Sequence, residues 1–219
     1  MMIIGVTGQI GMGKSVVSSM FKRLGFWVYD ADREARQLLD DDDVISKIRA
    51  IFGKGCLLPS GCVNRDYLRR CVLGSEENLR QLERLIHPRL SSLLVSFLRK
   101  AWINRCRGVV LDVPLLFEKG GWRRCDHVVV VSAPFFVQRA RLRRRGLSWG
   151  DMERFMALQW SDRQKCRAAD YIIKTGLGYD HAWRSVVWYV RHGLCGGSRK
   201  PLRAYLDGER RLKRERLYA

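Results

Sequence analysis

GVTGQIGMGKSV, residues 5–16, is the stretch from which the rest of the chain can be interpreted. It contains Gly8, four further residues and then Gly13-Lys14-Ser15, which is the spacing of a phosphate-binding loop. In such a loop, backbone N–H groups and the start of the next helix hold phosphate oxygens. The lysine reaches the outer phosphates of a nucleoside triphosphate, and the serine hydroxyl ligates Mg²⁺. The motif therefore predicts a bound nucleotide and leaves the phosphoryl acceptor open.

The segments beside the loop predict a parallel βαβ unit. An apolar run over residues 2–7 is typical of a buried strand, and residues 15–25 have helical periodicity that ends at Gly25. A second strand-like run, residues 26–32, ends in acidic residues. This order of elements gives the loop motif the structural context that a phosphate site needs.

The rest of the chain continues an α/β pattern. Residues 33–106 look helical and contain no clear strand, which is typical of a helical insertion that could bind the acceptor. Continuous apolar runs then predict buried parallel strands. They fall in residues 108–118 and 127–133. Residues 171–176 are expected to form the last strand, and a final helix is expected over 179–193.

Length and cysteine content limit the class of protein. The 219 residues suffice for one well-cored domain with an insertion, and no apolar run approaches the roughly 18 residues of a membrane span. The first residues lack the pattern of a signal peptide, so we expect a cytoplasmic protein. Seven scattered cysteines without C-x-x-C spacing predict reduced thiols rather than a zinc site or disulfides.

The formal net charge of +19 has three interpretations. A basic surface can bind nucleic acid, because neutralised phosphates supply most of the non-specific affinity. A basic cleft can also attract a small polyanionic substrate. The third interpretation is compositional drift, and charge alone does not separate the three.

Acidic residues follow two of the predicted strands. Asp30 and Asp32 end the second strand, where alternation would place both on one side and where parallel sheets bind ligands. One of them can orient an acceptor hydroxyl and accept its proton, or can cap the next helix. Asp112, at the end of the third strand, can assist Mg²⁺ or serve as a buried structural acid.

An arginine cluster lies within QRARLRRRGLS, residues 138–148. Such a run is commonly a solvated basic face. It can equally be a mobile lid that brings arginine onto the transferring phosphoryl group. Arg141 and Arg145 are four residues apart and would share one face of a helix.

Taken in order, these motifs make the chain resemble the dephospho-coenzyme A kinase family over about residues 3–176. The resemblance rests on TGQIGMGKS (7–15), VYDAD (28–32), GCVNRDYL (61–68), LERLIHP (82–88), PLLFE (114–118), CDHVVVV (125–131) and QRARLRRR (138–145), followed by Gln159 and Ala169-Asp170-x-Ile172. It implies a three-layer P-loop NTPase fold with a parallel sheet, a helical acceptor-binding insertion and a lid. The expected kinase domain is residues 1–198, with the insertion at about 33–106 and the lid at about 138–165. A basic tail, residues 199–219, lies outside the resemblance.

The resemblance also implies a reaction: transfer of the ATP γ-phosphate to the ribose 3′-hydroxyl of dephospho-CoA, with Mg²⁺. Carried onto this sequence, the catalytic residues are Asp32 as the base, Lys14, and Arg141 and Arg145 as lid arginines. The nucleotide site would comprise Gly8, Gly11, Met12, Gly13, Lys14, Ser15 and Val16. Asp32, Arg65, His87 and Pro88 would bind the acceptor, and Ser15 and Asp112 would serve the metal. For His87, a hydrogen bond that terminates a helix is an equal alternative.

Two departures from the family pattern stand out. Gln9 and Met12 replace small residues in the loop, and the larger Met12 side chain is expected to narrow its rim. Lys174-Thr175 stands where the family usually has an asparagine before the final glycine, so the sequence does not say which residues complete the adenine side of the site.

Two other functions are alternatives. One is a different P-loop kinase acting on a nucleotide or a shikimate-like alcohol, against which the DAD and PLLFE motifs argue. The other is a nucleic-acid-binding ATPase, but the sequence contains no recognised nucleic-acid-binding motif. We therefore expect ATP and dephospho-CoA as partners, no specific nucleic acid, no membrane, and a monomer or small homo-oligomer.

Overall fold

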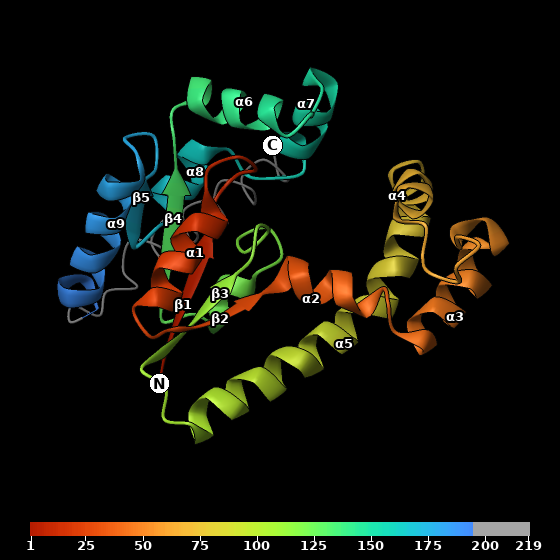
Figure 1. Ribbon diagram of the computed structural model, residues 1–219, viewed down its shortest axis with the longest axis horizontal. Helices are drawn as coiled ribbons and strands as arrows, with labels where there is room; N and C mark the ends of the chain where they lie inside the picture. The colour runs from red at the N-terminus through yellow and green to blue at the C-terminus, as the bar shows by residue number, and fades with distance from the viewer. Residues whose placement is uncertain (195–219) are drawn as a thin grey trace, which may run out of the picture. The chain divides into compact units, whose positions relative to one another are not determined.

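The computed structural model describes residues 1–194, which contain a five-stranded sheet (Figure 1). The strands lie in the order β2-β3-β1-β4-β5, and β1 pairs in parallel with both β3 and β4, as β4 does with β5. Val6 of β1 is in register with Asp112 of β3, so the loops that follow these two strands begin at the same edge. The strands are β1 Met2–Thr7, β2 Trp27–Asp30, β3 Gly108–Asp112, β4 His127–Ser132 and β5 Tyr171–Lys174.

Alternate residues of the central strands face opposite layers, because side chains along a strand alternate between the two faces. Ile4 and Val6 of β1 belong to a core that also contains Phe21 of α1 and Val186 of α9, and all four are fully buried. On the other face, Gly5 lies so close to Leu116 and Cys125 that a Cβ there would sit 2.6 Å from the Leu116 side chain. The sheet is therefore the middle one of three layers.

Helices alternate with the strands of the sheet along the chain, as in other α/β folds. Helix α6, in which the predicted lid begins, follows β4 and lies near the carboxyl end of that strand in Figure 1. The elements are α1 Lys14–Arg23, the short 3₁₀ turn η2 Gly121–Arg124, α6 Phe135–Arg144, α7 Trp149–Ala157, α8 Asp162–Arg167, α9 Tyr179–Trp188 and the π-helical segment η3 Tyr189–Gly193. No helix among residues 1–194 has the length and apolar character needed to cross a bilayer.

Residues 30–100 form a second compact unit, which is mainly helical. It has its own small core, in which Val44 and Ile48 of α3 pack with Cys56, Val63 and Leu68. A single bridge between Leu57 and Val63 is its only strand-like pairing among these residues. Its elements are α2 Ala31–Leu38, α3 Asp42–Phe52, the 3₁₀ turn η1 Lys54–Cys56, α4 Arg65–Leu73 and α5 Glu76–Ile103, which continues past residue 100.

The predicted α/β fold with a parallel sheet is confirmed, and residues 33–106 are helical as expected. The second strand is shorter than predicted. It ends at Asp30, whose carboxylate accepts the Arg33 N–H at 3.0 Å and caps α2. Asp32 therefore lies in the first turn of α2, and the expectation that strand alternation places it with Asp30 is wrong. The predicted tail, residues 199–219, lies outside the described residues.

Candidate active site

The loop between β1 and α1 has the backbone geometry of an anion site. Gly13 precedes α1 with φ 92° and ψ 22°, a left-handed conformation that favours glycine. No side chain caps the helix, so its first N–H groups are available to an external acceptor. Lys14 and the exposed Ser15 are the first two residues of α1. The exposed Val16 donates its backbone N–H to the Gly13 carbonyl at 3.1 Å.

Close approach requires a glycine at the other end of the loop. A Cβ at Gly8 would lie 2.5 Å from the Val131 carbonyl oxygen of β4, which leaves no room for a side chain. The glycines of the motif therefore serve two different purposes. Gly8 lets the loop leave the sheet beside β4, and Gly13 turns the chain into α1.

Lys14 forms an ion pair with Asp112 at the end of β3. The side chain of Asp112 is 2% exposed and that of Lys14 is 14% exposed, so the pair is shielded from solvent but still accessible from the lysine side. The register between β1 and β3 explains the contact, because it brings the end of β3 beside the loop. The structure thus brings together two predicted site residues that are 98 positions apart.

Arg141 of α6 binds the protein backbone of the loop. Its guanidinium donates to the carbonyl oxygens of Gly11 at 3.4 Å and Met12 at 3.2 Å, and to Thr175 Oγ1 at 2.9 Å and Thr175 O at 2.8 Å. The Thr175 hydroxyl donates in turn to the Met12 carbonyl at 2.6 Å. In this conformation, Arg141 and Thr175 hold the middle of the loop.

The side chain of Met12 does not narrow the rim of the loop, contrary to the expectation. It is 2% exposed, and its sulfur accepts the Ala133 N–H at 3.1 Å. An unbranched, polarizable thioether fills such a gap in a core well. The larger residue at this position is therefore accommodated inside the protein rather than at the phosphate face.

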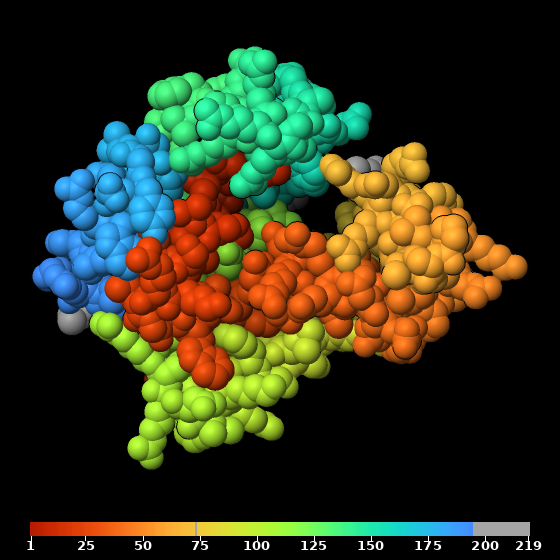
Figure 2. Space-filling view, viewed as in Figure 1, coloured from red at the N-terminus to blue at the C-terminus, as the bar shows by residue number. Residues whose placement is uncertain are grey.

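Arg145 lies in different surroundings from Arg141. It caps the carboxyl end of α6 and is exposed, and within residues 1–194 its guanidinium makes no hydrogen bond or ion pair. Arg143 and Arg144 are exposed as well, and Figure 2 shows the outer surface of α6 and α7 (green to teal) open to solvent. The two predicted lid arginines are thus separated into one that holds the loop and one that faces solvent.

Two glutamines contact the loop from other elements. Gln138 is buried and donates its side-chain amide to the Ile10 carbonyl at 2.7 Å. Gln159 accepts the Ile10 N–H at 3.1 Å. Sequence reasoning did not assign Gln138 a role, although its position at the start of the arginine cluster was a usable signal. Thr175 was noticed only as a departure from the family.

The helical unit, residues 30–100, carries the remaining predicted residues. Asp32 is exposed in the first turn of α2. Arg65 begins α4 and forms a half-exposed ion pair with Asp40 at 3.0 Å. Its guanidinium also donates to the Arg36 carbonyl at 3.3 Å. Arg65 is therefore already anchored to the segment that follows Asp32.

His87 and Pro88 are exposed in the interior of α5. The alternative in which His87 terminates a helix is wrong, because α5 continues from Glu76 to Ile103 through the proline. A proline inside a helix removes one N–H donor and normally bends the helix. The Pro88 carbonyl accepts the Ser92 hydroxyl at 3.1 Å.

Comparisons with known proteins agree on one family. A family model described as dephospho-CoA kinase matches residues 2–178. A dephospho-CoA kinase of Rhodospirillum rubrum is 41% identical over 188 residues, which cover 84% of this chain and 88% of that protein. A solved Thermus thermophilus protein superimposes with a TM-score of 0.76 at 28% identity, covering 89% of this chain and 98% of the other. The solved dephospho-CoA kinase of Campylobacter jejuni has the same fold, with a TM-score of 0.64 at 23% identity over 86% of this chain and 95% of the other.

Proposed function

The chain belongs to the dephospho-CoA kinase family, and we propose how its own residues perform the reaction of that family. The reaction is the ATP-dependent phosphorylation of dephospho-CoA to CoA, the last step of CoA biosynthesis. The observation that carries the residue assignment is the loop between β1 and α1, with Lys14 paired to Asp112 at its edge. The finer assignments below, including the 3′-hydroxyl as the acceptor atom, are proposals.

The nucleotide phosphates bind at the loop of residues 8–15. The uncapped start of α1 supplies N–H donors and a positive helix end. Lys14 exchanges its contact with Asp112 for the β- and γ-phosphates when the nucleotide is bound. Its cationic charge then balances charge that develops on the transferring group.

Mg²⁺ fits the residues present. It prefers a few oxygen ligands and keeps waters and phosphate oxygens for the rest of its coordination. The Ser15 hydroxyl and the Asp112 carboxylate are oxygen donors, on residues that flank Lys14 in the sequence and in space. When bound, the ion supplies charge neutralisation across the β- and γ-phosphates.

Asp32 acts as the base for the acceptor 3′-hydroxyl. Its neighbour Asp30 is committed to capping α2, so the capping role does not require Asp32. A carboxylate in this role orients the hydroxyl and takes its proton as the phosphoryl group is transferred. Arg65, His87 and Pro88, on α4 and α5, contact the rest of the CoA-like acceptor.

The two predicted lid arginines have different roles in this proposal. Arg141 shapes the loop through the carbonyls of Gly11 and Met12. Arg145, which faces solvent at the end of α6, moves onto the transferring phosphoryl group when the lid closes. The net charge of +19 serves two polyanionic substrates rather than a nucleic acid.

We place the enzyme in the cytoplasm. Six cysteines in the described part of the chain are free thiols, which suits a reducing compartment.

An acceptor panel tests the function. Purified protein is given ATP and Mg²⁺ with dephospho-CoA, shikimate or AMP, and ADP release is followed. We expect release with dephospho-CoA only, and CoA as the product by mass spectrometry. Lys14→Met is the matched inactive variant. Faster release with shikimate or AMP would contradict the function, and equal release without any acceptor would show an uncoupled ATPase.

A further inference from the structure

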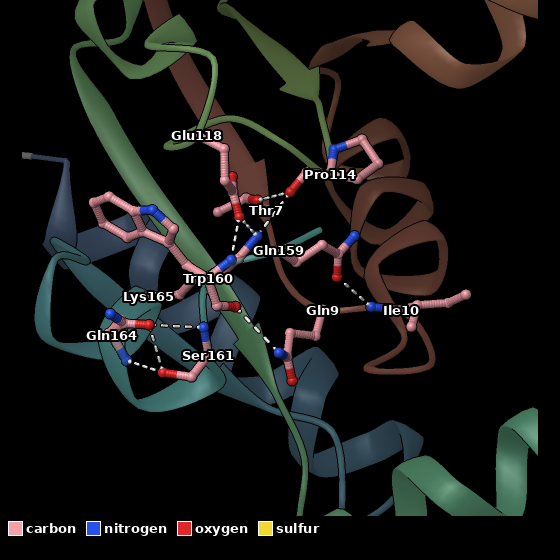
Figure 3. Close-up of polar contacts among 10 residues, drawn as sticks. All are labelled: Thr7, Gln9, Ile10, Pro114, Glu118, Gln159, Trp160, Ser161, Gln164 and Lys165. Atoms are coloured by element: carbon pink, nitrogen blue, oxygen red, sulfur yellow. Dashed lines mark hydrogen bonds and ion pairs between the residues drawn. The ribbon is translucent and has the colours of Figure 1, made fainter. Parts of the chain in front are cut away.

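Lys165 is a fully buried lysine that the phosphate-binding motif does not include. It lies in α8, its side chain is 0% exposed, and its ammonium donates to the Pro114 carbonyl at 2.8 Å and to Glu118 Oε1 at 3.1 Å (Figure 3). A buried ammonium is costly unless it is paired and hydrogen-bonded. Burial lowers the pKa of Lys165, and the Glu118 carboxylate opposes that effect.

Both acceptors of Lys165 are shared with a second donor. The Pro114 carbonyl also accepts the Thr7 hydroxyl at 2.9 Å, and Glu118 Oε1 also accepts the Trp160 N–H at 2.6 Å. Lys165 therefore ties α8 to the turn after β3 at two oxygens, one of which also contacts the end of β1 and the other the segment before α8. Removing the ammonium would leave the two oxygens with one donor each.

The segment before α8 reaches the phosphate-binding loop directly. The Trp160 carbonyl accepts the side-chain amide of Gln9 at 3.1 Å, and Gln159 Oε1 accepts the Ile10 N–H at 3.1 Å. Figure 3 shows these two contacts pointing from residues 159 and 160 toward the loop. The Trp160 ring stacks on Phe117, with centroids 5.3 Å apart and an interplanar angle of 5°. We call Glu118, Gln159, Trp160 and Lys165 the brace.

The brace connects the two parts of the site that must stay in register. One side holds Gln9 and Ile10 in the loop, and the other holds Pro114, two residues after Asp112. We propose that Lys165, through Glu118, is a positioning residue for phosphoryl transfer: it fixes the loop relative to Asp112 and so sets the position of Lys14 and the bound nucleotide. This inference rests on the proposed nucleotide site. Because its side chain is fully buried, we assign Lys165 no direct contact with either substrate.

The position of these groups matters because phosphoryl transfer depends on alignment. A displacement of about 1 Å in a reacting group can cost about 100-fold in rate. A residue that only holds the fold together would lower stability and leave the turnover of each folded molecule unchanged. The two roles therefore separate in kinetics measured per active site.

The test compares Lys165→Met with Arg167→Met, which removes an exposed charge from the same helix. Melting temperature, MgADP dissociation constant, and kcat and KM for ATP are measured, with the active-site concentration determined from the MgADP titration. For Lys165→Met we expect a lower melting temperature, an MgADP dissociation constant raised at least about fivefold and a kcat lowered at least about tenfold. We expect Arg167→Met to stay within about twofold of wild type in every measurement.

A second variant keeps the test decisive if Lys165→Met does not fold. Glu118→Gln preserves the side-chain volume and the acceptor for the Trp160 N–H while removing the charge that faces Lys165. A loss of threefold or more in kcat/KM per active site supports the proposal, and a smaller change overturns it. A folded Lys165→Met with only a lower melting temperature also overturns it. The MgADP dissociation constant is measured without an acceptor. Its comparison between variants therefore tests the position of the loop even if the wild-type protein fails to phosphorylate dephospho-CoA.

Discussion

The Thr175 hydroxyl donates to the Met12 carbonyl at 2.6 Å and joins the strand end of β5 to the phosphate-binding loop across 163 positions of sequence. The same hydroxyl accepts from Arg141 at 2.9 Å, and the residue is buried. Thr175 therefore forms part of the loop's support.

Replacing Thr175 by valine tests this support. Valine keeps the shape but removes one of the two donors to the Met12 carbonyl and one acceptor of the Arg141 guanidinium, and each lost hydrogen bond costs about 0.5–1.5 kcal/mol. We expect a lower free energy of unfolding in urea and weaker MgADP binding by calorimetry. Thr175→Ser retains the hydroxyl and should bind like wild type. Equal MgADP binding by the valine and serine variants would show that the Thr175 hydroxyl does not support the loop.

Asp32→Asn tests the base. The proposed mechanism does not use this carboxylate for nucleotide binding, so the KM for ATP should stay close to the wild-type value. Loss of a general base should lower kcat by about 10²–10⁴-fold. The matched control is Asp30→Asn, because asparagine caps a helix about as well as aspartate and should keep α2 in place. A near-normal kcat for Asp32→Asn would exclude it as the base.

The arginines of α6 should give different phenotypes. Arg141→Gln removes the donors to the Gly11 and Met12 carbonyls and should weaken MgADP binding and lower the melting temperature together. Arg145→Gln should leave both unchanged and lower kcat by about 100-fold or more, as loss of a transition-state cation does. Arg143→Gln, which changes an exposed neighbour, is the control. Weaker MgADP binding by Arg145→Gln, together with a lower kcat alone for Arg141→Gln, would contradict the proposed roles.

Cysteine reactivity reports on the packing of α8. Burial, together with the Asp162 carboxylate, raises the pKa of Cys166 to about 11, whereas Cys62 is exposed. At pH 8 only about one Cys166 thiol in a thousand is ionised, and the thiolate is the reactive form. Iodoacetamide followed by peptide mass spectrometry should therefore label Cys62 first and Cys166 only on unfolding. Equal labelling rates in the folded protein would show that α8 opens readily.

The strands of the sheet were largely predictable because burial on both faces leaves a continuous apolar run. Residues 127–133 predict β4, His127–Ser132, almost to its ends. The boundary at Asp30 was not predictable in this way, since a carboxylate can end a strand or cap a helix with the same spacing. Residues 33–106 were correctly predicted to be helical, and only the alternative that ends a helix at His87 is wrong. A proline usually interrupts a helix, whereas α5 continues through Pro88.

The site was predictable only where a motif is contiguous. The phosphate-binding loop is contiguous, so its glycines and Lys14 could be assigned from their spacing. The contacts of Lys165 with Glu118 and of Thr175 with Met12 join residues far apart in the chain. No local periodicity encodes such pairs. The fold creates them by bringing the ends of parallel strands to one edge of the sheet.

Transfer of label from ATP tests the central claim most directly. Protein, Mg²⁺, γ-³²P-labelled ATP and dephospho-CoA are mixed, the CoA product is isolated, and its phosphates are located by selective 3′-nucleotidase digestion and ³¹P NMR of unlabelled product. The account predicts one labelled phosphate, on the ribose 3′-oxygen, and no transfer by Lys14→Met. Label at any other position of the product, or ATP hydrolysis without a labelled CoA, would contradict it.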